Sequence, residues 1–300
     1  MNSLSVIVPA SDGRPTVERV TAAIRRAEAA PDELIVVDEP VGLGAAAARN
    51  RGARRATGDI LVFVDADVEV HADAFKRIRT AFDANPTLAA VFGSYDDDPD
   101  ADGLVSEFRN LLHHHVHQQG AGLAPTFWTG LGAIRRDLFV ELGGFDEDIA
   151  FMEDIELGGR LNRRGAAVLL DPAVQGKHLK RWTLVTMTKT DLLHRGVPWL
   201  QLILEGRTGA TALNLGWRHR VSTMLTLVVC WGLVRRRWGV VAASQSALVG
   251  LDAEFYGLLL RRGGIRLALA GIPLHAVHRL TSVAAVPLAL AAHLRRGRRG

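Results

Sequence analysis

Two carboxylates that follow one apolar segment of the chain have the chemistry of a metal site. Within residues 58–69, the five apolar residues Ile60–Val64 predict a strand that is buried on both faces. Asp65 and Asp67 come directly after it. In an open α/β sheet the ligand crevice lies beyond the carboxyl ends of the strands, and Mg²⁺ or Mn²⁺ takes carboxylate and phosphate oxygens together. We therefore expect Asp65 and Asp67 to hold a divalent metal that bridges a diphosphate.

The elements that must position these carboxylates alternate between strand and helix. They are expected at residues 4–9, 16–30, 34–38, 45–57 and 60–64. Pro9 ends the first strand, the acid Asp38 ends the second, and Thr16 is the expected cap of the first helix. Strand, helix and strand at this spacing predict a parallel sheet with right-handed crossovers, which is an α/β arrangement.

The loop after the second predicted strand also fits a different class of enzyme. Residues 42–47 match the Gly-x-Gly-x-x-Ala form of a dinucleotide-binding turn, and Asp65 follows at roughly the expected distance. The dinucleotide fingerprint, however, follows the first strand of its fold. A nicotinamide-dependent oxidoreductase that uses Gly42 and Gly44 is therefore an alternative, beside a simple turn that leads into a closely packed helix.

Charge divides the chain into two regions. Residues 1–200 carry 22 basic and 29 acidic side chains, a net charge of −7, whereas residues 201–300 carry 14 arginines and 3 acids, a net charge of +11. Basic charge mixed with apolar runs favours an anionic membrane surface, and the aromatic and basic interleaving of a nucleic-acid groove is missing. The single cysteine, Cys230, excludes an intramolecular disulfide framework and fits a reducing compartment.

Three uncharged apolar runs in the C-terminal region predict contact with a membrane. They are residues 221–234, 238–251 and 280–294. Each is shorter than the roughly twenty residues of a simple span. Interfacial or re-entrant helices, tilted spans and helices buried against the rest of the protein all remain open. In a spanning hairpin Arg235, Arg236 and Arg237 would lie on the far side, against the positive-inside tendency, so we expect association from the cytoplasmic face.

The order of six motifs along residues 3–200 resembles that of family 2 glycosyltransferases. Four resemble the nucleotide-sugar half: Leu4-Ser5-Val6-Ile7-Val8-Pro9, Val36-Val37-Asp38-Glu39, Ala47-Ala48-Arg49-Asn50-Arg51-Gly52 and Asp65-Ala66-Asp67. Two resemble the acceptor half: Gly143-Gly144-Phe145-Asp146-Glu147 and Met152-Glu153-Asp154-Ile155-Glu156-Leu157. The resemblance implies a GT-A fold, a Rossmann-like and mostly parallel α/β sheet flanked by helices. It also implies a nucleotide-diphosphate sugar donor, a divalent metal (Mg²⁺ or Mn²⁺) and an inverting displacement.

The same resemblance assigns the nucleotide end of the donor to the first two strands. Asp38 matches the acid that contacts the base or ribose, Arg49 lies in the segment that closes over the nucleotide, and Pro9 ends the neighbouring strand. Many members of the family have a glycine and a serine after two acids at this point, whereas this chain has Pro40 and Val41. The identity of the base is therefore left open.

The diphosphate and metal end of the donor is assigned to later residues. Asp67 matches the metal-binding acid of the family, with Asp65 beside it. His178 stands where the family often has a late ligand for the diphosphate or metal, and Arg181-Trp182 resembles the end of the Gln-x-x-Arg-Trp motif of processive members. His178 occupies the glutamine position of that motif, so processivity does not follow.

Asp154 is the candidate general base for the acceptor hydroxyl. It forms a pair with Glu153, which we assign to the donor site, just before a predicted helix over residues 155–164. A metal neutralises the leaving diphosphate, but the attacking hydroxyl needs a base. A carboxylate at a helix N-terminus can equally be a cap, and the order of the motifs favours the base. Because one well-placed carboxylate follows the donor half, we expect a single, inverting displacement.

The histidines of residues 113–117 are not expected to bind a metal, because consecutive residues of a helix point in different directions. We predict that they form a polar helical face near the acceptor cleft. Glycines at positions 130, 132, 143 and 144 either permit close approach of a ligand to a wall of that cleft that includes Trp128 and Arg135, or form ordinary turns.

Two regions are expected along the chain. Residues 1–214 form a catalytic domain with a nucleotide-sugar half (1–100) and an acceptor half (101–214), and residues 215–300 form an apolar, arginine-rich, membrane-associated helical region. No signal peptide is recognisable, so we expect the protein at the cell membrane with its catalytic domain on the cytoplasmic side. The expected partners are a nucleotide sugar, a glycan or lipid-linked acceptor and membrane lipid, and no nucleic acid. A non-catalytic membrane protein that binds nucleotide sugars is a further alternative.

Overall fold

A mixed β-sheet forms the centre of the protein, in a computed structural model that describes residues 2–13, 15–209 and 216–297. Its strand order is β2-β1-β3-β7-β5-β8-β4, and β6 pairs with β8. The strands are β1 (Leu4–Pro9), β2 (Glu33–Val37), β3 (Ile60–Val64), β4 (Val68–Val70), β5 (Leu88–Tyr95), β6 (Gly122–Leu123), β7 (Leu131–Arg135) and β8 (Ala167–His178). As predicted, β2, β1 and β3 are parallel, whereas β7 is antiparallel to both β3 and β5. The parallel half therefore carries the first three strand ends to one edge.

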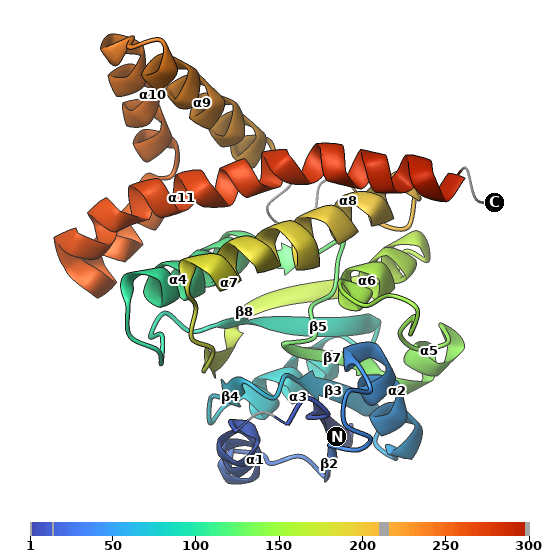
Figure 1. Ribbon diagram of the computed structural model, residues 1–300. Helices are drawn as coiled ribbons and strands as arrows, with labels where there is room; N and C mark the ends of the chain where they lie inside the picture. Colours follow the sequence, from blue (N-terminus) through green and yellow to red (C-terminus); the bar gives the residue numbers. More distant parts are fainter. Residues whose placement is uncertain (1, 14, 210–215, 298–300) are drawn as a thin grey trace.

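Helices cover both faces of this sheet (Figure 1). Those that flank it are α1 (Val17–Arg26), α2 (Ala45–Arg55), α3 (Ala74–Ala84), α4 (Leu104–Gln119), α5 (Arg136–Glu141) and α6 (Glu153–Arg163). α1 ends earlier than predicted because the chain turns through Ala29, whose φ is 50°, to enter β2. Thr16 precedes α1 but does not cap it with its side chain. Instead its hydroxyl donates to the carbonyl oxygen of Ala66, between the two predicted metal ligands.

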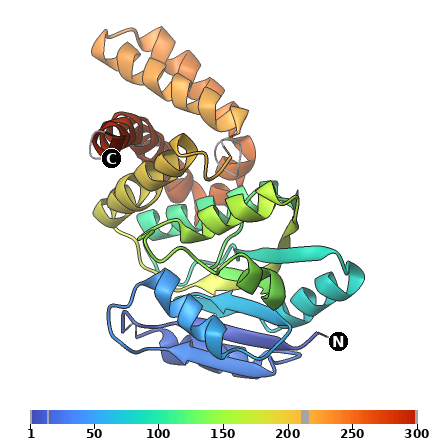
Figure 2. The ribbon, with the colours of Figure 1, turned by 90° about the vertical axis from the view of Figure 1, so that its right-hand side faces the viewer.

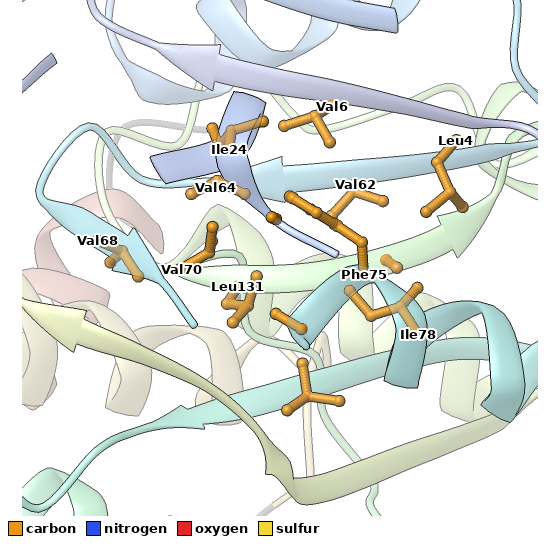
Figure 3. Close-up of a cluster of buried hydrophobic side chains, with 14 of the residues drawn as sticks. Leu4, Val6, Ile24, Val62, Val64, Val68, Val70, Phe75, Ile78 and Leu131 are labelled. Atoms are coloured by element: carbon orange, nitrogen blue, oxygen red, sulfur yellow. The ribbon is translucent and has the colours of Figure 1, made fainter. Parts of the chain in front are cut away.

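Buried side chains pack on both faces of β3. The face under α1 and α3 is filled by aliphatic residues and phenylalanine, among them Leu4, Val6, Ile24, Val62, Val64, Phe75 and Ile78 (Figure 3). On the opposite face, Leu61 and Phe63 pack in one cluster with Phe139, Phe145 and Leu157. Fully burying each such side chain contributes about 1.5 to 3 kcal/mol. The five apolar residues of β3 are therefore buried as predicted, and they make a rigid base for the loop that follows.

The C-terminal helices form a further layer beside the sheet domain. α7 (Leu184–Lys189), the π-helix η1 (Thr190–Gly196) and α8 (Val197–Leu204) follow one another without a break and run alongside α11 (Ala253–Gly297) (Figure 1). α9 (Trp217–Val234) and α10 (Trp238–Leu251) form a hairpin that projects from this layer, as Figure 2 shows. The expected region boundary at 214/215, and Arg298 and Arg299 of the basic C-terminus, lie outside the described residues.

α11 is long and apolar enough to cross a membrane over Ala253–Arg295, and among the described residues no other helix passes this test. Gly264, with φ 66°, breaks its regular geometry. In its most apolar window 39% is buried inside the protein, and Phe255 and Leu259 pack in one cluster with Phe108 of α4. α11 is therefore attached to the sheet domain.

Candidate active site

Asp65 and Asp67 flank a tight turn between β3 and β4. The N–H of Asp65 donates to the carbonyl oxygen of Gly130 at 3.1 Å, and the N–H of Val68 donates to the carbonyl oxygen of Asp65 at 2.9 Å. The side chain of Asp67 is buried, whereas that of Asp65 is half-buried. The turn therefore gives the two carboxylates different surroundings.

His178 lies beside Asp67 because β4 pairs with the end of β8. Val68 is opposite His178 in the antiparallel register, and Nε2 of His178 is 3.8 Å from Oδ2 of Asp67. Nδ1 of His178 donates to Oδ1 of Asn110 at 2.7 Å, and the imidazole stacks on Tyr95 with ring centroids 4.1 Å apart. Since an amide oxygen accepts only, this bond assigns the proton to Nδ1 and leaves the lone pair of Nε2 on the side of Asp67.

Asp67 and His178 fit a divalent metal whose coordination is completed by a substrate. In the part of the chain that the structure describes, no three carboxylate, imidazole or thiolate groups converge as a complete metal site. Mg²⁺, however, is commonly held by one or two protein ligands together with phosphate oxygens and water. Oδ1 of Asp65 already accepts from Nη2 of Arg49 at 2.7 Å. The geometry therefore favours Asp67 over Asp65 as the direct ligand.

Arg49 joins the two acidic motifs. Its guanidinium forms ion pairs with Asp65, at the end of β3, and with Glu153, at the start of α6. The side chain is buried, and its terminal carbon lies 5.7 Å from the ring centroid of Phe145. Burial opposes the charge, but the carboxylates of Asp65 and Glu153 outweigh it and raise the pKa of Arg49 above its usual value. Arg49 thus connects the first and second halves of the sheet domain.

Asp154 lies in the first turn of α6. The preceding Met152 has φ 72°, a left-handed conformation that is uncommon outside glycine and that turns the chain sharply into Glu153. Oδ1 of Asp154 accepts from the N–H of Ile155 at 2.8 Å, and Oδ2 accepts from the N–H of Thr129 at 3.4 Å. Burial and the neighbouring carboxylate of Glu153 raise the pKa of Asp154 to about 6. Met152 holds the cap position, so the alternative that Asp154 is the cap residue is not supported.

Asp154 and His178 line one cavity of about 180 Å³. Its other walls are mainly aromatic: Tyr95, His113, His117, Trp128, Trp182 and Trp199. Arg195 of η1 also lines it. The candidate base and a candidate metal ligand therefore face the same cavity, next to a cation.

The other predicted donor residues lie in different places. Pro9 pairs with Val37 at the ends of β1 and β2, and Asp38 follows as an exposed residue on the same sheet edge as Asp65. Trp182 is buried, and its Nε1 donates to Oδ1 of Asn110 at 3.3 Å, on the same oxygen that His178 uses. Arg181 is exposed between β8 and α7 and does not line the cavity.

Two of the four histidines of α4 do not lie on a polar face, contrary to the prediction. α4 packs along β5, so that His113 and His117 are buried and line the cavity. Nδ1 of His117 donates to the carbonyl oxygen of Gly93 at 2.9 Å. Burial lowers the pKa of His117 to about 4 and that of His113 well below its usual value, so both rings are neutral at pH 7. Trp128 lines the cavity as predicted, but Arg135 lies opposite the first residue of β3, at the far end of the sheet.

Five residues of this site were missed in the sequence: Tyr95, Arg109, Asn110, Arg195 and Trp199. They belong to β5, α4, η1 and α8, and none of them stands in a recognisable motif. For Arg195 and Trp199 the neighbouring Gly196 and Pro198 were a weak signal, because glycine and proline mark irregular backbone. The irregularity is the π-helix η1, a geometry that is frequent at functional sites.

The sheet and its Asp-x-Asp edge define a GT-A domain. A solved structure with the same fold is the mannosyltransferase PcManGT from Pyrobaculum calidifontis in complex with GDP-Man and Mn²⁺, which shares 22% identity with a TM-score of 0.57 and covers 96% of this chain and 87% of that one. Residues 39–143 match the family described as Glycosyl transferase family 2. This match and the glycosyltransferase relatives described below show that the chain is a glycosyltransferase, which removes the oxidoreductase alternative. Gly42 and Gly44, with φ 79° and 85°, form the turn before α2.

Two curated relatives are also glycosyltransferases. The O-antigen chain rhamnosyltransferase RfbN of Salmonella typhimurium is 24% identical over 242 residues, which is 69% of this chain and 77% of that protein. The pre-mycofactocin glycosyltransferase of Mycobacterium tuberculosis is 28% identical over 160 residues, 51% of this chain and 33% of that protein. The similarity to this second relative thus covers about a third of its length.

Proposed function

We propose that this glycosyltransferase is metal-dependent and inverting, and that it moves a sugar from a nucleoside-diphosphate sugar to an acceptor hydroxyl with Asp154 as general base. The observation that carries this proposal is the shared cavity, with Asp154 on one wall and His178, beside Asp67, on another. The solved mannosyltransferase of the same fold contains GDP-Man and Mn²⁺, which supports a nucleotide sugar and a divalent metal here. A metal held by Asp67 and His178 would neutralise the charge of the leaving diphosphate.

The residues of the site have separate roles in this reaction. Asp38 and Pro9 face the nucleoside at the ends of β1 and β2, and Arg49 positions the carboxylates of Asp65 and Glu153. Asp154 accepts the proton of the acceptor hydroxyl as that oxygen attacks the anomeric carbon. Among the described residues Asp154 is the carboxylate that lines the cavity. In the described ranges no second carboxylate, which a covalent glycosyl intermediate would need, lines this cavity, and this favours direct displacement with inversion.

Thermal stabilisation identifies the donor. The detergent-extracted protein is heated with UDP, GDP, dTDP or NAD, each with and without Mn²⁺, because a ligand that binds the folded state raises its stability by mass action. We expect one nucleoside diphosphate to raise the melting temperature only when Mn²⁺ is present. Stabilisation by NAD without metal, or by no nucleotide at all, would contradict the proposed donor site.

The variant Asp154→Asn tests the base. It should keep the metal-dependent stabilisation by the nucleotide, but the release of nucleoside diphosphate from the corresponding nucleotide sugar should fall by about 10²- to 10⁴-fold. Asp137→Asn is the control, because the side chain of Asp137 is 99% exposed on α5. Unchanged turnover in Asp154→Asn would remove this residue from the mechanism.

We also propose that the C-terminal helices attach the enzyme to the cytoplasmic face of a membrane. Large apolar side chains are exposed along the α9–α10 hairpin: Trp217, Val221, Met224, Val228, Trp231, Val234 and Trp238. Arg235, Arg236 and Arg237 lie between its two helices, where they can contact anionic lipid headgroups. Deleting the whole region would also remove α11 from α4, so substitutions in the hairpin are the cleaner test.

Vesicle flotation measures this attachment. The double variant Val228→Glu and Trp231→Glu changes two exposed residues of α9 and is expected to shift the protein from the vesicle fraction to the soluble fraction, while its melting temperature stays near that of the wild type. Vesicles with and without anionic lipid report the contribution of the arginines. If the double variant floats like the wild type, α9 is not the attachment surface.

A further inference from the structure

A second cavity adjoins the catalytic one. Its volume is about 660 Å³, and it lies between the η1–α8 segment, α9 and α11. Arg109, Arg195 and Trp199 line both cavities. The space in which the reaction is proposed to occur therefore continues, at these three side chains, into a larger space among the C-terminal helices.

The larger cavity is apolar along most of its walls. Its aliphatic lining comes from three helices and consists of Leu200, Ile203, Met224, Leu227, Val283 and Val286. The size of the cavity is in the range of pockets that hold small organic ligands. Walls of this kind favour a hydrocarbon guest, because each buried methylene group gains free energy on leaving water.

The junction between the two cavities carries a net positive charge, because two arginines face one carboxylate there. Arg109 is neutralised within the protein, because its Nη2 is 2.7 Å from Oδ1 of Asp191, whose Oδ2 is in turn 2.8 Å from Nδ1 of His278. Arg195 forms no ion pair with any residue in the described ranges. An arginine on the wall of a cavity is a favourable partner for a phosphate group, to which it can donate two hydrogen bonds.

We propose that the acceptor is a hydroxyl group on the head group of a lipid phosphate, whose hydrocarbon chain occupies the cavity between α8, α9 and α11 and whose phosphate binds Arg195. This inference rests on the proposed function and names its acceptor class. The hydroxyl of the acceptor reaches Asp154 from the junction and gives it a proton. The hydroxyl oxygen forms a bond to the anomeric carbon of the donor, the bond from that carbon to the diphosphate breaks, and the nucleoside diphosphate leaves with the electron pair.

Position 286 offers a matched test of the hydrocarbon site. Val286 and Leu288 are both on α11 and both 45% exposed, but only Val286 lines the cavity. The probe is dodecyl phosphate with a photoreactive diazirine at the end of its chain, applied to the full-length protein, and the labelled peptides are located by mass spectrometry. We expect labels on α8, α9 and α11, a loss of at least tenfold in Val286→Trp, and no change in Leu288→Trp. Equal labelling of the two variants would overturn the inference.

Substitution of Arg195 tests the phosphate site. The wild type should take up dodecyl phosphate at least tenfold better than the diazirine analogue of dodecanol, whereas Arg195→Gln should take up both equally. Inorganic phosphate without a chain should not compete at equal concentration, which separates a lipid phosphate from free phosphate. If the wild type does not prefer the phosphate, or if Arg195→Gln keeps the preference with an unchanged melting temperature, the assignment of Arg195 is wrong.

Nucleotide binding distinguishes failure of this inference from failure of the proposed function. Val286 is not part of the donor site, so Val286→Trp should keep the stabilisation by nucleoside diphosphate and Mn²⁺ while it loses the lipid label. Undiminished labelling of that variant, with nucleotide binding intact, contradicts the lipid site alone. Absence of nucleotide binding in the wild type contradicts the glycosyltransferase mechanism itself, and with it the acceptor role of any lipid that is labelled.

Discussion

Nε2 of His178 lies 3.8 Å from Oδ2 of Asp67, although the two residues come from distant parts of the chain. The antiparallel pairing of Val68 with His178 creates this proximity, and Asn110 orients the imidazole through Nδ1. The three-residue strand β4 is therefore the element that brings an imidazole to the Asp-x-Asp turn.

The first prediction concerns this pair of residues. Asp67→Asn should abolish the Mn²⁺-dependent part of the stabilisation by nucleoside diphosphate. Asn110→Ala should lower the affinity for Mn²⁺ by about 10- to 100-fold, because the loss of the Asn110 side chain leaves the imidazole of His178 free to rotate. Asp65→Asn should have a smaller effect on metal affinity, since Oδ1 of Asp65 is bonded to Arg49. Titration of Mn²⁺ at a saturating nucleotide concentration measures all three. A full metal effect in Asp67→Asn would rule out Asp67 as a ligand.

The second prediction concerns the pH dependence of Asp154. Its pKa in the folded state is raised to about 6, above the value of roughly 3.9 in an unfolded chain. Ionisation of Asp154 therefore lowers the stability of the folded protein as the pH rises above about 4. Asp154→Asn should therefore be more stable than the wild type by about 1 to 2 kcal/mol at pH 7, and this difference should disappear below about pH 4. The wild-type turnover should fall as the pH drops through about 6, because a protonated Asp154 cannot act as base. Urea unfolding and turnover, each measured from pH 4 to 8, report the two effects.

The third prediction concerns Arg49. Replacement by methionine should lower the free energy of unfolding by about 3 to 5 kcal/mol, because Asp65 and Glu153 lose their common buried cation. Arg51→Met is the control, since Arg51 is an exposed residue of the same helix and should change the stability by no more than about 0.5 kcal/mol. If both variants unfold at the same urea concentration, the ion pairs of Arg49 do not hold the two halves together.

The fourth prediction concerns the close packing of α6. A Cβ atom at Gly158 would lie only 2.4 Å from the backbone nitrogen of Phe127, which is closer than van der Waals contact allows. Gly158→Ala should therefore destabilise the protein by about 1 to 3 kcal/mol. At Gly250, in α10, a Cβ meets no atom within 4 Å, and Gly250→Ala should be neutral or stabilise by up to about 1 kcal/mol. A lower melting temperature for Gly158→Ala, with an equal or higher one for Gly250→Ala, would support this packing. An unchanged melting temperature for Gly158→Ala would show that α6 can move away from Phe127.

Local sequence patterns predicted the parts of the fold whose environment is uniform along a segment. Ile60–Val64 is a buried strand because five consecutive apolar residues fit a strand that is covered on both faces, and the three parallel strands followed from their spacing. The order of the motifs led to Asp67 and Asp154, which the structure places near one cavity. Whether they act as ligand and base stays a prediction.

The rest of the site could not be predicted because it depends on which surfaces of distant elements meet. The polarity of an imidazole does not say whether its helix face is covered, so His113 and His117 were assigned to a polar face although β5 buries them. Arg195 and Trp199 acquire their place from η1, a backbone irregularity without a sequence signature. Arg181 was assigned with Trp182, but only the latter reaches the cavity.

The position of β7 has a consequence for how the protein folds during its synthesis. β7 (Leu131–Arg135) lies between β3 and β5, both of which are translated earlier. Until residue 135 has left the ribosome, the facing edges of β3 and β5 have no partner strand, and unpaired edges are sites of aggregation. The first hundred residues therefore cannot complete their sheet alone, and a fragment that ends there is expected to be insoluble. The two halves of the domain therefore fold together, because the second half supplies the strand that pairs with the free edge of β3 in the first half.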